Sequence, residues 1–210
     1  MSPELAIFVL VVIFIVGWFA LGTHVNVRKG HRFLEWLQGG LPLIGEKTSL
    51  RWLGSSVVHL QIEKAREPFR RAEVLIVLEP RDVPPFWLLW RLRGRRDLLI
   101  VRTELRSVPT QQLEILDRQA WSTKAVQFEV REQPWEPVTC DKPPFQAYAL
   151  PPAANIPELL AEGESTGLPL VRIGVRRTNN SLEMQWLLPS QPASAARAVF
   201  ETVQRVARQV

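Results

Sequence analysis

The sequence predicts an α+β fold: one N-terminal transmembrane helix, then a mainly antiparallel sheet of about seven or eight strands, closed by a C-terminal amphipathic helix. Three observations support this prediction. Residues 5–22 contain no ionisable side chain. Apolar and polar residues alternate in several short segments after residue 48, as in strands with one buried face. Residues 195–210 repeat apolar side chains at helical spacing.

Composition limits what this chain can be. It has 210 residues, of which 46% are hydrophobic and 22% charged, close to a globular average. These values exclude a disordered tail, a collagen-like chain and a polytopic transporter, and a single Cys excludes an internal disulfide framework. We therefore expect a transmembrane anchor over 1–23, a basic juxtamembrane segment and linker over 24–47, and one α+β domain over 48–210.

The apolar segment 5–22 reads LAIFVLVVIFIVGWFALG. As an α-helix it would span about 27 Å, close to the hydrocarbon thickness of a bilayer. Trp18 and Phe19 lie near its end, where an interfacial aromatic belt is expected. The alternative is a cleaved signal peptide, with 20–22 as a weak cleavage site, but such peptides begin with positive charge and this one begins with Met-Ser-Pro-Glu. A retained anchor is the better interpretation.

Flanking cations predict the orientation of this anchor. Its N-terminal side carries Glu4, whereas its C-terminal side carries Arg28, Lys29 and Arg32. The positive-inside rule then puts the N-terminus outside the cell membrane and the remaining domain in the cytoplasm. The single Cys140 is compatible with a reducing compartment.

The segment after the anchor, 31–38, reads HRFLEWLQ and has apolar residues at helical spacing before Gly39 and Gly40 end it. One interpretation is an interfacial helix on the lipid headgroups. The side chains expected at that interface are Arg28, Lys29, Arg32, Phe33 and Trp36. The alternative is a helix packed onto the domain.

The first strands of the domain are predicted from alternation and turn residues. Segments 49–53 and 56–63 flank Gly54-Ser55, a two-residue hairpin signal. The run VLIVL at 74–78 is typical of a central strand covered on both faces. Residues 98–105 form another strand candidate.

Residues 109–169 contain nine prolines, which predicts loops with edge strands, because proline cannot donate to a central ladder. Within this region we expect one helix over 110–119, an alternating strand at Val126, Phe128 and Val130, a weaker strand over 145–150 and a helix starting at 157–161.

The C-terminal region predicts a hairpin and a closing helix. Val171, Ile173 and Val175 should face one side, with Arg172 and Arg176 on the other, and a polar turn then leads into 182–188. Pro192 should open the final helix. This order of strands followed by one helix is loosely similar to the pleckstrin-homology fold, an architectural analogy that implies no function.

A basic and aromatic patch lies at 84–97, PPFWLLWRLRGRRD. Over 81–106 there are seven Arg and three acids, so this window carries +4 of the chain's net charge of +5. Aromatic rings beside arginines suit an anionic headgroup layer. The residues expected to bind a membrane or a partner are Phe86, Trp87, Leu89, Trp90, Arg91, Arg93, Arg95 and Arg96. The alternatives are a short core helix with solvated arginines, or docking onto another membrane protein.

Signatures of catalysis and of cofactor binding are missing from the sequence. His24, His31 and His59 are scattered, and Cys140 has no partner at a metal-ligand spacing, so we expect no metal and no cofactor. The segment 40–48 imitates a phosphate loop, but an acid displaces its lysine by one residue. Nucleic acid is disfavoured because no recognition motif accompanies the arginines.

We therefore expect a non-enzymatic, single-pass membrane protein whose cytoplasmic domain docks on the anionic inner leaflet or on a membrane partner, as an adaptor or accessory protein. The first alternative is a structural accessory subunit of a larger integral membrane complex. The second is an enzyme whose site cannot be recognised from sequence.

Overall fold

A single continuous helix forms the N-terminal part of the protein. The computed structural model describes residues 2–132, 135–150, 155–191 and 195–210. Helix α1 (Pro3–Gln38) is capped at its start by the Ser2 hydroxyl, which accepts a hydrogen bond from the Leu5 amide, and it ends at Gly39. The predicted span and the predicted segment 31–38 are thus two parts of one helix. Among the described residues it is the one helix that is long and apolar enough to cross a membrane.

The domain is built on one nine-stranded sheet in which every neighbouring pair of strands is antiparallel. The strand order is β1-β2-β3-β4-β9-β8-β5-β7-β6. The strands are β1 (Thr48–Leu53), β2 (Val57–Ile62), β3 (Phe69–Val77), β4 (Leu98–Leu105), β5 (Gln112–Asp117), β6 (Glu136–Val138), β7 (Phe145–Leu150), β8 (Leu170–Arg176) and β9 (Ser181–Leu187). The predicted α+β fold is confirmed, but the likeness to the pleckstrin-homology fold is not.

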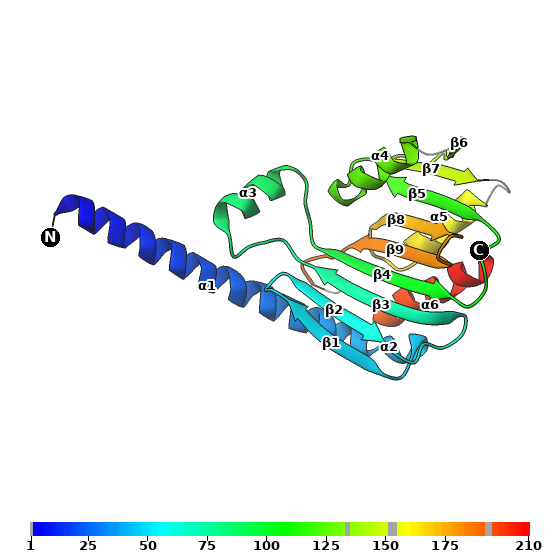
Figure 1. The fold of residues 1–210 in the computed structure, drawn as a ribbon, viewed down its shortest axis with the longest axis horizontal. Helices are drawn as coiled ribbons and strands as arrows, with labels where there is room; N and C mark the ends of the chain where they lie inside the picture. The colour runs from blue at the N-terminus through cyan, green and yellow to red at the C-terminus, as the bar shows by residue number, and fades with distance from the viewer. Residues whose placement is uncertain (1, 133–134, 151–154, 192–194) are drawn as a thin grey trace.

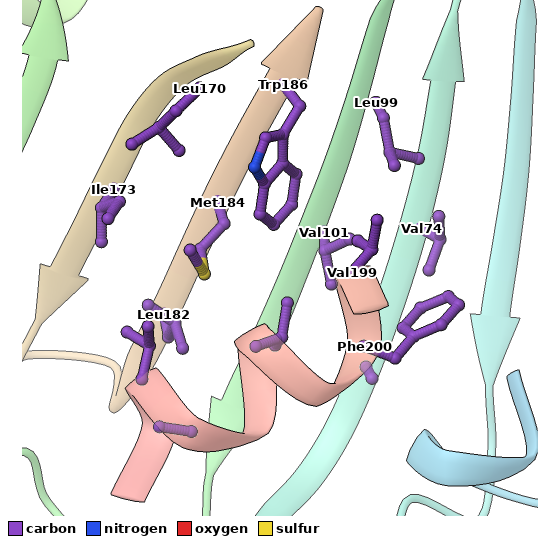
Figure 2. Packing of buried hydrophobic residues seen from close by; sticks show 14 of the residues in the cluster. Val74, Leu99, Val101, Leu170, Ile173, Leu182, Met184, Trp186, Val199 and Phe200 are labelled. Carbon is purple, nitrogen blue, oxygen red and sulfur yellow. The ribbon is translucent and has the colours of Figure 1, made fainter. Parts of the chain in front are cut away.

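Helices cover one face of this sheet (Figure 1). They are the C-terminal half of α1, α2 (Leu41–Ile44), α5 (Ile156–Glu164) and α6 (Ala196–Gln209). Figure 2 shows Val199 and Phe200 of α6 packed among core side chains of the central strands, including Trp186. Phe200 and Trp186 are fully buried, and burying each large apolar side chain stabilises the fold by roughly 1.5–3 kcal/mol.

Two predicted elements of the middle region are wrong. Residues 112–117 form strand β5 rather than a helix, because Leu113 and Ile115 alternate into the core while Glu114 faces the opposite side. The predicted strand around Phe128 is helix α4 (Lys124–Glu132), which follows the short 3-10 turn η1 (Trp121–Thr123). The apolar alternation there had no neighbouring strand to pair with, and Phe128 remains 65% exposed.

The expectation that the proline-rich region supplies only edge strands is also wrong. Strand β5 lies inside the sheet, between β8 and β7. No proline occurs between Pro109 and Pro134, so β5 keeps all its amide donors. Strand β6, which contains Pro137, lies at the edge as expected.

The C-terminal hairpin differs from its prediction at one residue. Ile173 and Val175 face the helices, but Val171 packs with Leu98 and Ile100 on the opposite face of the sheet. The register of β8 against β9 shifts between Leu170 and Arg172, which places Val171 on that face. The predicted helix start at Pro192 lies outside the described residues.

Candidate functional site: the junction of the anchor with the domain

Helix α1 begins to pack against the domain at Gly22, where its exposed apolar segment ends. From this point its buried residues recur about every four positions, beginning with Gly22, Asn26 and Gly30. A Cβ atom on Gly22 would lie 2.2 Å from the Arg81 carbonyl oxygen, and one on Gly30 would lie 2.4 Å from the Trp52 ring. The two glycines therefore allow α1 to pack closely on the domain, Gly22 against the connection after β3 and Gly30 against Trp52 of β1.

Polar contacts fix this interface. The Asn26 side-chain amide donates to the Glu79 carbonyl at 3.0 Å, and its oxygen accepts from Arg81 Nη1 at 3.1 Å. Arg81 also holds Asp97 through two parallel contacts of 3.1 and 2.9 Å, and Lys29 Nζ of α1 lies 2.5 Å from Asp97 Oδ2. We name these five residues the junction network.

The junction network pairs buried carboxylates with cations. Asp97 and Glu79 are 3% and 2% exposed, and the Glu79 amide donates to Asp97 Oδ1 at 2.6 Å. Burial alone would raise the pKa of Asp97, but the hydrogen bonds and positive charges of Arg81 and Lys29 outweigh it and hold that pKa below its ordinary value. Asp97 is therefore an ionised group that links the sheet to helix α1.

Helix α3 (Pro84–Leu92) lies beside α1 on the connection between β3 and β4 (Figure 1). Trp18 of α1 and Trp87 of α3 have ring centroids 6.2 Å apart, and Trp18 Nε1 donates to the Arg81 carbonyl at 2.9 Å. The Trp87 indole and the Arg91 guanidinium both reach back to the Glu79 carboxylate, at 2.7 and 3.1 Å. These contacts hold α3 at the level where the apolar segment of α1 ends.

These contacts divide the predicted basic and aromatic patch into residues that point toward Glu79 and residues that are exposed. Trp87 and Arg91 turn inward toward Glu79, whereas Phe86 and Leu89 are 58% and 42% exposed. No residue of α3 is buried, so the alternative of a core helix does not hold. Arg93 and Arg96 are exposed, and Trp90 and Arg95 are half-buried. Contact of this patch with lipid or with a partner stays a prediction.

The residues predicted at the headgroup interface after the anchor also separate into two groups. Phe33 is fully buried in the core, Lys29 is bound to Asp97, and Trp36 is half-buried against the core. The position of Phe33 therefore agrees with the alternative prediction, a helix packed onto the domain. Arg28 and Arg32 are exposed on the same helix, and their contact with headgroups remains a prediction.

Sequence reasoning missed the acids and the amide of the junction network. Glu79 and Asp97 are separated by the α3 connection, and neither follows a recognisable motif. One available signal was the spacing of Gly22, Asn26 and Gly30, which puts a polar side chain between two small residues on one helix face. That pattern predicts close packing of α1, although not the partner.

A second buried group of charges lies on the sheet face opposite α6. Glu114 is fully buried and binds Arg172 through two contacts of 2.9 Å, and Arg176 also reaches it at 2.9 Å. Glu183 joins Arg172 to Arg102 at 2.8 and 2.5 Å. These five residues, the sheet-face network, connect neighbouring strands β4, β9, β8 and β5.

Other candidate sites are weak in the part of the chain that the structure describes. No group of three or more His, Cys, Asp or Glu side chains there is placed to hold a metal ion. The half-buried Cys140 lines a cavity of about 310 Å³ with Arg118 and Tyr148.

No protein-family model matches this chain, and no curated protein matches it either. Function must therefore be argued from the junction of the anchor with the domain.

Proposed function

We propose that this chain is a non-enzymatic, single-pass membrane protein whose cytoplasmic domain is held against the inner leaflet as an adaptor or accessory protein. The observation that carries the proposal is α3. It has no buried residue, it exposes Phe86, Leu88, Leu89 and Leu92, and it lies beside Trp18 at the end of the apolar segment of α1. An amphipathic helix at that level is suited to the headgroup boundary, with its apolar side chains in lipid.

The junction network supports the same proposal from the side of the domain. Because α1 continues into the core without a linker, the direction of the anchor fixes the direction of the sheet. The domain is then presented to other membrane proteins in one orientation, which raises the effective concentration of its surfaces for partners in the same membrane.

A depth measurement tests the position of α3. A spin label would be placed at Leu89→Cys in full-length protein that carries Cys140→Ser, reconstituted in bilayers. The matched control is Phe128→Cys, since α4 is also nine residues long and Phe128 is also an exposed apolar residue. We expect the label at 89 to be accessible to oxygen and protected from a water-soluble nickel chelate, and the label at 128 to show the reverse. Equal chelate accessibility at both positions would refute an interfacial α3.

The orientation of the anchor has a separate test. Ser2→Cys and Gln61→Cys variants, each in the Cys140→Ser background, would be treated in intact cells with a membrane-impermeant maleimide. The flanking Arg28, Lys29 and Arg32 predict labelling at position 2 alone. Labelling at position 61 from outside would reverse the proposed topology.

The adaptor role is tested by purification in a mild detergent. Stoichiometric co-purification of an integral membrane protein, lost when Phe86 and Leu89 are both changed to Ser, would shift the proposal to an accessory subunit that docks through α3. A monomer whose α3 still lies at the lipid boundary supports docking on the leaflet itself.

A further inference from the structure

The arginines around α3 fall into two classes. Arg81 and Arg91 are bound to the buried carboxylates Asp97 and Glu79. Arg93, Arg95 and Arg96, in contrast, have no carboxylate within 4.0 Å among the described residues. The positive charge that remains uncompensated is therefore concentrated just after the end of α3, while the acids nearby are already satisfied by Lys29, Arg81 and Arg91.

Two of these unpaired arginines lie over tryptophan rings. The Arg95 guanidinium lies 4.8 Å from the centre of the Trp121 ring and 5.8 Å from that of Trp90. Arg93 lies 5.7 Å from the same Trp90 ring, and the two rings pack edge to face at 5.4 Å. A stacked guanidinium keeps its N–H edge free to donate while its rotamers are restricted, which lowers the entropic cost of binding an anion.

A backbone turn at Gly94 connects Arg93 to Arg95 and Arg96. Gly94 has φ +83°, a left-handed conformation that favours glycine, and nothing lies within 4 Å of the position of its missing Cβ. Arg96 Nη1 donates to the carbonyls of Arg91 and Arg95, at 3.0 and 2.7 Å, so its guanidinium folds over the end of α3. Glycine is therefore present for its backbone conformation, and the turn allows Arg93 and Arg95 to lie against the same Trp90 ring.

Half-burial makes this place favourable for an anion. Burial lowers the pKa of Arg95 from its ordinary value, although Glu79 and Asp97 oppose that change from a distance. A partly desolvated cation without a counter-ion gains more from a bound anion than a fully hydrated one does. Phosphate oxygens suit the fork of a guanidinium through two parallel hydrogen bonds.

We infer that Arg93, Arg95 and Arg96, supported by Trp90 and Trp121, form a binding site for the phosphate of an anionic glycerophospholipid. The site adjoins the exposed apolar face of α3, so one lipid can place its phosphate on the arginines and its acyl chains along Phe86 and Leu89. This inference rests on the proposed position of α3 in the headgroup layer. The lipid, rather than a soluble phosphate, is the ligand because the arginines continue directly from that apolar helix.

Native mass spectrometry of full-length protein in detergent tests the site. Phosphatidylglycerol and phosphatidylcholine would be titrated separately and their bound adducts counted. We expect Arg93→Gln, Arg95→Gln and Arg96→Gln together to weaken phosphatidylglycerol binding roughly 10- to 100-fold, and to weaken binding of phosphatidylcholine, whose phosphate is balanced by its own choline, much less. The matched control carries Arg66→Gln, Arg70→Gln and Arg208→Gln, which removes the same charge from exposed positions away from α3.

Each remaining outcome decides against the site or against its ligand. Equal losses in the two triple variants would mean that net charge alone attracts the lipid, and retention of binding in the α3 variant would overturn the site. Tight binding of soluble glycerol phosphate would overturn the lipid as the ligand. The spin label at position 89 is measured in parallel in neutral bilayers: if it stays at the lipid boundary while the arginines prove dispensable, the proposed function survives and this inference alone fails.

Discussion

The junction network and the sheet-face network are built from the same kind of buried ion pair, but they join different parts of the fold. Each contains a carboxylate that is almost fully buried and that binds two cations, Asp97 in the first and Glu114 in the second. The sheet-face network joins strands that already pair through their backbones. The junction network joins α1 to the end of β3 and the start of β4; these two strands pair with each other, but no ladder connects α1 to either of them. We conclude that the sheet-face network stabilises the sheet and that the junction network sets the direction of helix α1 relative to it.

The largest expected effects come from removing either buried carboxylate. Asp97→Ala removes the buried carboxylate that Lys29 and Arg81 share, and Glu114→Ala removes the one that Arg172 and Arg176 share, so each should cost about 3–5 kcal/mol of unfolding free energy. Chemical unfolding of the full-length protein in detergent measures this cost.

The two variants should differ in the direction of the anchor. Spin labels at Arg28→Cys and Gln61→Cys, in a Cys140→Ser background, report the distance from α1 to the sheet. That distance distribution should broaden for Asp97→Ala and stay narrow for Glu114→Ala. Equal broadening in both would remove the distinction between the networks.

Glycine substitutions sharpen the comparison at intermediate cost. A Cβ on Gly22 meets backbone atoms of Arg81, whereas a Cβ on Gly174 meets the ends of the Glu114 and Arg172 side chains at 2.9 and 3.0 Å. Backbone yields less than a side chain, so Gly22→Ala should destabilise by about 1–3 kcal/mol and Gly174→Ala by less. Gly17→Ala is the control, because nothing lies within 4 Å of that position. A larger loss of thermal stability for Gly174→Ala than for Gly22→Ala would contradict this prediction.

Acid should weaken both networks. The pKa of Asp97 is held below 3.8, and that of Glu183 is lowered from 4.5 by Arg172 and Arg102 despite the opposing effect of burial. Groups with a lowered pKa contribute stability that is full above the unfolded-state value and is lost as pH falls through the folded-state value. Unfolding curves recorded between about pH 7 and about pH 3 should therefore show a smaller loss for Asp97→Asn than for the unchanged protein. An identical pH slope would show that Asp97 is not the linked group.

The smallest effect is expected at the exposed end of the sheet-face network. Arg102 is 51% exposed in its side chain, so Arg102→Gln should change the unfolding free energy by less than about 1 kcal/mol. A loss comparable to that of Glu114→Ala, measured in the same denaturant series, would mean that the sheet-face network stabilises the sheet as one unit.

The fold was predictable where one local pattern dominated. The apolar segment of α1, the hairpin across Gly54, and the amphipathic α6 each show their periodicity within a few residues. The structure confirms these elements, but Leu53 pairs with Val57, so the hairpin connection is residues 54–56 rather than the predicted two residues Gly54-Ser55. The predictions for 110–119 and for Phe128 were wrong because the local patterns there were short and ambiguous. Strand β5 is specified by its two neighbours, β7 and β8, which come later in the chain.

By itself the sequence determined that an apolar segment is followed by an α+β domain, and that its net charge gathers around α3. Only the tertiary structure decided that the helix of the apolar segment runs on into the core, that Arg91 is neutralised by Glu79, and that Arg93, Arg95 and Arg96 have no carboxylate partner among the described residues. The physical reason is that periodicity and net charge are properties of a local segment. Pairing of buried charges depends on which distant residues the fold brings within a few ångströms, as with Lys29 and Asp97.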